Sequence, residues 1–63
     1  MDMQKKFEQR LYEVSLEIHR AETANDRAAG EDKRQALLDG ADAMGADLYP
    51  VLIDIDEKAR LDA

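Results

Sequence analysis

Apolar residues recur every three or four positions through the first half of the chain. They are Met3, Phe7, Leu11, Val14, Ile18, Ala21 and Ala28, with Asn25 in the remaining slot of the series. This spacing is that of a helix and differs from the alternation of a strand. Asp2 is suited to cap the start of such a helix, and Gly30 to follow its end, because glycine readily takes a positive φ. The pattern predicts one helix over residues 3–29 and a turn near Gly30.

The apolar series resumes after the turn and keeps its phase to the end of the chain. It continues as Leu37, Ala41, Met44, Leu48, Val51, Ile55 and Ala59. Two long helices joined by a short connection pack side by side in opposite directions. We therefore expect an antiparallel helical hairpin whose second helix covers residues 32–61, with a kink or break at 45–50.

The segment DGADAMGADLYP (39–50) leaves alternatives open, because it holds two of the three glycines and the only proline. A kinked helix is favoured by the unbroken phase of the apolar residues. In a second arrangement Gly45 ends the second helix and Pro50 opens a third, since the residue before a proline is disfavoured from helical geometry. The stretch VLIDID (51–56) alternates and is compatible with a short strand, although no other segment alternates to pair with it.

The expected fold class is all-α, with a core along the two apolar stripes. The predicted core and dimer residues are Phe7, Leu11, Val14, Ile18, Leu37, Ala41, Met44, Leu48, Val51 and Ile55. Chains of this size bury too little surface to be very stable alone. Without cysteine a disulfide is impossible, so we expect a homodimer in which two hairpins form a four-helix bundle.

Charge and composition limit the kinds of functional site that we expect in this chain. The net charge is -6, and residues 29–63 carry -5 of it, as nine acids against four bases. Ser15 and His19 share a helix face, but no third group is spaced to orient them as a nucleophile and its base. The aspartates of 39–56 lack the spacing of a calcium loop. We expect no catalytic residue, cofactor or metal site, and therefore not an enzyme.

No apolar run is long enough to span a membrane, and no apolar leader for export is present. We therefore expect a cytoplasmic protein that does not bind membranes.

A set of residues off the apolar stripes is predicted to contact a partner. An aromatic and apolar group with a charged rim is typical of protein interfaces. The residues are Tyr12, Leu16, His19, Tyr49 and Ile53, with Asp54, Asp56 and Glu57 as an acidic rim. Gly40 and Gly45 are expected where another helix packs closely, because a small residue lets a backbone approach.

The chain length, the turn expected near residue 30, the heptad-patterned hairpin and the segment DLY (47–49) together resemble the Rop family. That resemblance implies a dimeric four-helix bundle that binds paired RNA loops through its first helix. The basic residues available there are Lys6, Arg10, Arg20 and Arg27.

The leading functional hypothesis is a small regulatory or inhibitory protein that binds another protein, of the kind that phages and other mobile elements encode. One alternative is an RNA-binding modulator similar to the Rop family. Another is an acidic mimic of nucleic acid that blocks a basic site, because the second half of the chain is strongly acidic.

Overall fold

Three α-helices make up the fold in the computed structural model, which describes residues 2–63. They are α1 (Met3–Arg20), α2 (Ala24–Ala43) and α3 (Tyr49–Asp62). No strand occurs in these residues. The all-α class is confirmed, but the chain has three helices where the apolar pattern predicted a two-helix hairpin.

The first helix is shorter than predicted, because the chain breaks at 21–23 and not near Gly30. Asp2 caps α1 as expected, accepting a hydrogen bond of 3.0 Å from the backbone N–H of Gln4. Thr23 caps α2 in the same way, accepting one of 3.1 Å from the backbone N–H of Asp26. Threonine followed three residues later by an acid is a helix-start signature, and it outweighs the apolar phase that runs through Ala21.

Thr23→Ala tests this break, because it should change the free energy of unfolding in opposite directions with a break at 21–23 and with an uninterrupted helix. Loss of the cap should lower the free energy of unfolding by about 1 kcal/mol. In an uninterrupted helix over 3–29 the same change would raise it, since alanine is the better helix former. Urea unfolding followed by circular dichroism gives the sign, and Thr23→Ser should keep most of the wild-type stability.

The second break, at residues 44–48, is the one that the alternative with a third helix predicted. Gly45 has a φ of 86°, the left-handed conformation that favours glycine. The N–H of Ala46 donates to the carbonyl of Ala41 at 2.8 Å, and that of Gly45 to Asp42 at 3.0 Å. This pair of bonds closes the C-terminus of a helix in the Schellman motif. The kinked-helix prediction is therefore wrong, and so is the strand over 51–56, which lies inside α3.

Helix α3 has its proline at a position where a helix tolerates it. Pro50 lies in the first turn, where its missing N–H has no helical partner to lose. An Asp47 carboxylate oxygen accepts from the N–H of Tyr49 at 3.2 Å. The backbone of Asp47 is also held by Gln4, whose amide donates to its carbonyl at 2.8 Å and accepts from its N–H at 3.0 Å.

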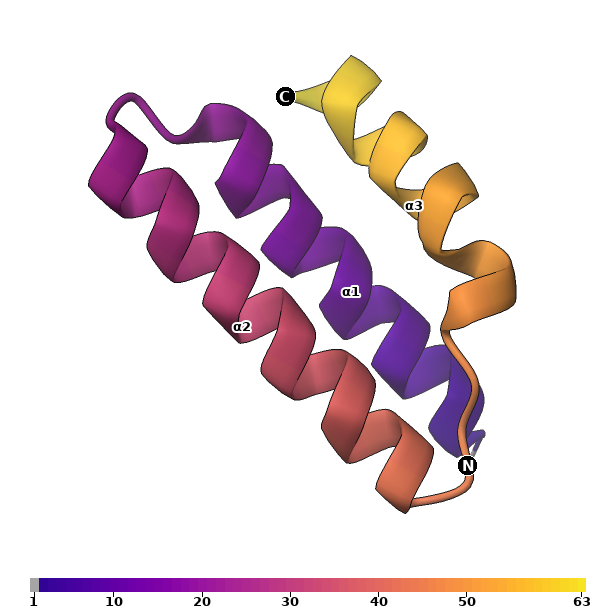
Figure 1. Ribbon diagram of the computed structural model, residues 1–63. Coiled ribbons are helices and arrows are strands. Elements are labelled where there is room, and N and C mark those ends of the chain that lie inside the picture. Colours follow the sequence, from indigo (N-terminus) through magenta and orange to yellow (C-terminus); the bar gives the residue numbers. More distant parts are fainter. Residues whose placement is uncertain (1) are drawn as a thin grey trace.

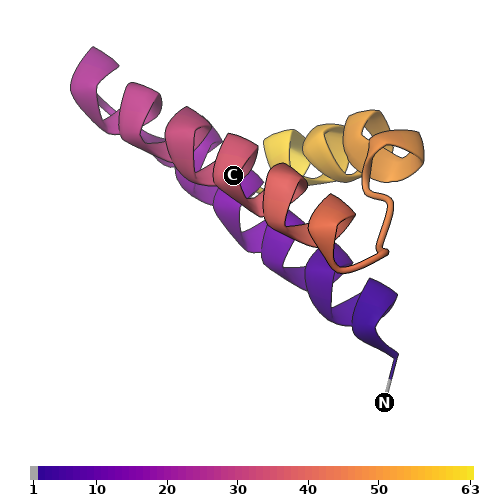
Figure 2. The same cartoon turned by 60° about the horizontal axis from the view of Figure 1, so that its bottom comes forward.

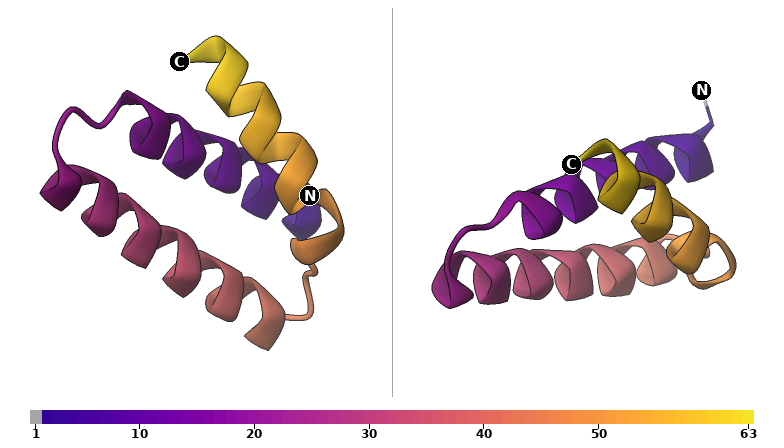
Figure 3. Two further views of the ribbon diagram at one scale, coloured as in Figure 1. Left: turned by 45° about the horizontal axis from the view of Figure 1, so that its top comes forward. Right: turned by 90° about the horizontal axis from the view of Figure 1, so that it is seen from above.

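Helix α1 lies in the middle of the molecule, with α2 along one side and α3 along the other (Figure 1). After the loop at 44–48, α3 turns back along α1 and does not continue in line with α2 (Figure 2). It lies obliquely to the other two helices in both views of Figure 3. Because Gln4 contacts Asp47 and Arg20 contacts Asp62, α1 and α3 run in the same general direction.

The core lies where the three helices meet. Its central cluster is Leu11, Leu38, Ala41, Ala46 and Leu48, packed by the partly buried Phe7, Leu37, Val51, Leu52 and Ile55. Val14, Ile18 and Ala59 are also buried. Nine of the ten predicted core positions are thus buried or partly buried. Met44 is the exception, with 59% of its surface exposed, because α2 ends at Ala43 and Met44 belongs to the turn.

Helices α1 and α2 approach each other closely at Gly30, where the sequence predicts a turn. Gly30 is buried in the middle of α2, and a Cβ placed on it would lie 2.6 Å from Cγ1 of Ile18 on α1. A Cβ at Gly40 or Gly45, the two glycines predicted for close packing, would meet nothing within 4 Å. The small residue that lets α1 and α2 approach is therefore Gly30.

Candidate protein-interaction surface

A groove between α2 and α3 gathers several exposed side chains. Its lining residues are Arg34, Gln35, Leu38, Tyr49, Leu52, Ile53 and Asp56, and its volume is about 360 Å³. We call it the α2–α3 groove. Its apolar side chains come from both helices, and Arg34 and Asp56 lie together at one end.

Tyr49 and Ile53 are the most prominent apolar side chains of this groove. They lie one helical turn apart on α3, so they occupy the same side of the helix. Tyr49 is 56% exposed and Ile53 is 78% exposed. A neighbouring exposed pair beside a groove is a feature of interaction sites, whereas isolated exposed apolar residues are common on any protein.

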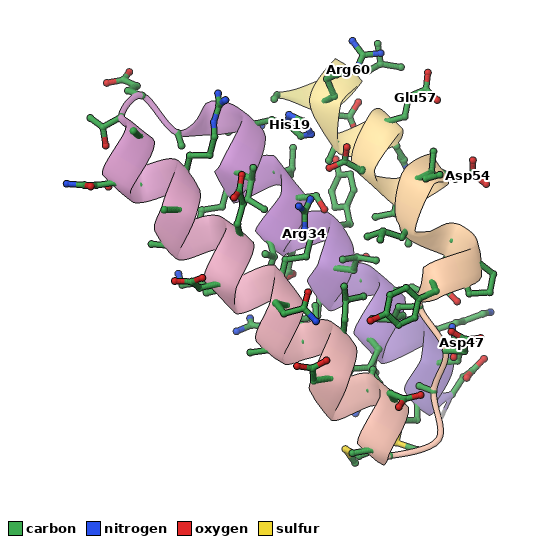
Figure 4. All side chains as sticks on the ribbon, viewed as in Figure 1. His19, Arg34, Asp47, Asp54, Glu57 and Arg60 are labelled. Carbon is green, nitrogen blue, oxygen red and sulfur yellow. The ribbon has the colours of Figure 1, made fainter. Side chains whose placement is uncertain are left out.

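One end of the groove is held by a polar cluster that joins all three helices. The Asp56 carboxylate of α3 lies 3.0 Å from Nε2 of His19 on α1 and 3.5 Å from a guanidinium nitrogen of Arg34 on α2. Figure 4 shows His19 reaching from α1 towards α3. These side chains are about two-thirds to three-quarters buried, so the contacts are better shielded from water than an exposed ion pair. Asp56 and Arg34 are thereby fixed in position at the groove.

Tyr12 does not join Tyr49 and Ile53 but lies against the other side of α3. Its hydroxyl donates to the carboxylate of Asp62, and the ammonium of Lys58 lies 5.4 Å from the centre of its ring. The hydrogen bond to Asp62 raises the pKa of Tyr12 above its ordinary value of 10.0, with desolvation and the charge of Asp62 adding to it and Arg20 opposing it. Tyr12 thus ties α1 to the end of α3.

The raised pKa of Tyr12 predicts a pH dependence confined to alkaline solution. The neutral phenol is stabilised in the folded chain, so this stability is present below pH 10 and is lost as the pH rises through the folded-state pKa. In a Tyr49→Phe background, absorbance titration of phenolate formation reports Tyr12 alone. Asp62→Ala should move the pKa of Tyr12 down towards 10, whereas Asp62→Asn, which keeps an acceptor, should retain part of the shift. An unchanged titration in Asp62→Ala would contradict the contact.

The remaining predicted partner residues are dispersed. Leu16 is half-buried on α1. Asp54 and Glu57 are exposed and project from the outer side of α3, together with Arg60 (Figure 4). Glu57 lies 3.7 Å from Arg60 one turn further along. The structure therefore brings Tyr49, Ile53 and Asp56 to one groove with His19 behind Asp56, and leaves Tyr12, Leu16, Asp54 and Glu57 outside its lining.

Four groove residues were not among the predicted partner residues. They are Arg34, Gln35, Leu38 and Leu52. Arg34 and Leu38 lie four residues apart, and this spacing places them on one side of α2. That signal is present in the sequence, but only the break at 44–48 lets α3 turn back along α1, so that its residues face this side of α2 across a groove.

The Ser15 hydroxyl, which shares a helix face with His19, is not exposed at this surface. Ser15, one turn from His19, is completely buried, and its Oγ has no hydrogen-bond partner within the chain. No group of three or more potential metal-ligating side chains gathers in this part of the chain.

The described helices were also compared with the length and hydropathy that membrane spans require. None of them is both long and apolar enough to cross a bilayer.

The chain was compared with known families, curated proteins and solved structures. No family model, curated protein or solved structure matches it. The resemblance to the Rop family gains no support from these comparisons. The break at 21–23 and the third helix also differ from a hairpin of two long helices.

Proposed function

We propose that this protein acts by binding another protein through the α2–α3 groove, as a small regulator or inhibitor. The observation that carries the proposal is the exposed pair Tyr49 and Ile53 beside a groove whose polar residues Arg34 and Asp56 are held in place. Binding, and not catalysis, is the activity that such a surface supports.

The residue types at the groove suit a binding site. Tyrosine and arginine are enriched among residues that dominate interface energies, and a large apolar side chain next to them supplies buried area. Because His19 and Arg34 hold Asp56 before any partner arrives, little conformational entropy is lost at that position on binding. A partner that fits presents an apolar side chain to Tyr49 and Ile53 and a polar group to Asp56 or Arg34.

Affinity capture from the native host with matched variants tests the proposal. Ile53→Glu places a charge in the groove, and Leu61→Glu places the same charge at another exposed apolar residue of α3, one that does not line the groove. We expect a protein captured by the wild type to be retained by Leu61→Glu and lost by Ile53→Glu. Both variants should keep the helical circular dichroism of the wild type, because both positions are largely exposed.

Equal capture by the two variants would reject the groove as the binding site. Capture of RNA, lost at raised salt and on replacing Arg10 and Arg20, would favour the RNA-binding alternative. Of the four basic residues considered for that alternative, Arg10 lies 3.8 Å from a carboxylate of this chain, that of Glu13. Loss of inhibition on reversing the charges of Asp47, Asp54 and Asp56, with Ile53→Glu still active, would favour acidic mimicry.

A further inference from the structure

A second surface, on the α1 and α2 side of the molecule, has no role in the proposed binding site. A groove of about 520 Å³ runs between these helices, lined by Met3, Phe7, Leu37 and Met44 with the cations Lys6 and Arg10. We call it the α1–α2 groove. Met3 is 42% exposed and Met44 59% exposed, so part of this apolar lining faces water.

Helix α2 adds a face of small residues beside this groove. Ala36, Gly40 and Ala43 are spaced four and three residues apart, which places them on one side of the helix. All three are exposed, and a Cβ at Gly40 would meet nothing within 4 Å. No helix of the chain itself covers this face, and an incoming helix backbone could approach Gly40 as closely as Ile18 approaches Gly30.

We propose that two copies of this chain form a twofold dimer through the α1–α2 groove and the small-residue face, with their α2 helices crossing at Gly40. A small-residue face is complementary to its own copy, as a twofold interface requires. The small-residue faces of the two α2 helices then meet, and Leu37 and Met44 beside them lose contact with water.

The charges around this surface favour a second acidic copy as the occupant. The charged residues that line the groove are both cations, although the chain as a whole carries -6. At about 100° per residue, Asp32 and Asp39 lie on the opposite side of the small-residue face from the groove. When the twofold axis runs parallel to the two α2 helices, the side of one copy that carries Asp32 and Asp39 faces Lys6 and Arg10 of the other copy.

A dimer interface of standard size would take a small part of the surface of this chain. A stable interface buries roughly 800 Å² on each partner. That is less than a fifth of the 4426 Å² of accessible surface on the chain. Tyr49 and Ile53 of the α2–α3 groove lie on α3, outside this dimer interface, whereas Gln35 of the groove donates a hydrogen bond of 3.0 Å to Asp39 at the acidic edge of the interface.

Sedimentation velocity over a range of concentrations tests the dimer with a variant that leaves the monomer intact. We expect the wild type to reach twice the 7.1 kDa of one chain. Gly40→Leu should raise the dissociation constant of the dimer at least tenfold, because the leucine prevents the helices from approaching. Its thermal midpoint as a monomer should be unchanged or higher, since the side chain enters open space and leucine is a better helix former than glycine.

Two further variants make the outcome decisive. Met44→Glu, in the same surface, should weaken the dimer as Gly40→Leu does, whereas Ile53→Glu in the α2–α3 groove should leave it unchanged. A wild type that stays monomeric at all concentrations would overturn the proposal. A dimer that survives Gly40→Leu and is lost in Ile53→Glu would also overturn it, by placing self-association at the other groove.

Discussion

In a Leu11→Ala variant, most molecules should be unfolded at 25 °C. Leu11 has no exposed surface and belongs to the central cluster where the three helices meet. Truncating a buried leucine to alanine costs about 2–5 kcal/mol, because it removes transfer free energy and leaves a cavity. A single core in a chain of this size rarely supplies more than about 3–5 kcal/mol. This one substitution is thus expected to remove nearly all of the free energy that stabilises the fold.

Far-UV circular dichroism and urea unfolding measure this effect, with Leu61→Ala as the matched control. Leu61 is also a helical leucine, but 70% of its surface is exposed. Its truncation should change the free energy of unfolding by less than about 0.5 kcal/mol, as is usual for surface substitutions. A Leu11→Ala variant as stable as Leu61→Ala would show that the core does not centre on Leu11.

Gly30→Ala and Gly40→Ala should change stability in opposite directions. Both glycines lie inside α2, so alanine raises helix propensity by up to about 1 kcal/mol at each. At Gly40 the added methyl meets nothing, and the variant should be more stable by about that amount. At Gly30 it would lie 2.6 Å from Cγ1 of Ile18, a stiff β-branched side chain. Overpacking of this kind costs about 1–3 kcal/mol, so Gly30→Ala should be the less stable protein.

Urea titrations of both variants at a concentration where the chain is monomeric provide the comparison. The double variant Gly30→Ala with Ile18→Ala tests whether contact with Ile18 causes the loss of stability in Gly30→Ala. Removing Cγ1 should relieve the overlap, so the double variant should be more stable than the sum of the two single effects. Equal stabilisation by Gly30→Ala and Gly40→Ala would mean that α1 and α2 do not approach closely at Gly30.

The two breaks in the chain show why the helix ends were harder to predict than the helices. The apolar phase from Leu37 to Ile55 runs through residues 44–48 without a shift, yet the chain turns back there. A polar cap and a positive-φ glycine each act within one turn, whereas the apolar repeat is read over many residues. A helix end at Gly45 was among the alternatives, whereas Thr23 was not identified as a cap because the apolar periodicity runs through it.

The candidate site could be predicted only in part, because the pattern of one helix does not tell which helix lies beside it. Tyr49 and Ile53 were predicted because they lie off the apolar stripe, and Asp56 as part of an acidic rim; the structure places all three at one groove. Tyr12 was chosen by the same rule and lies against the opposite side of α3. Position around a helix tells which residues avoid the core of that helix. It does not tell which neighbouring helix they meet.

The amino-acid pattern was enough to predict that the chain is helical, that Asp2 caps the first helix, and which residues fill most of the core. These features depend on spacing and on interactions a few residues apart, which a single sequence contains. Only the tertiary structure decided that Gly30 is the close approach to Ile18, that Met44 faces water, and that Asp56 joins His19 to Arg34. Those facts depend on the direction in which α3 leaves the loop at 44–48. That direction follows from the packing of all three helices together, because no local preference of the loop residues specifies it.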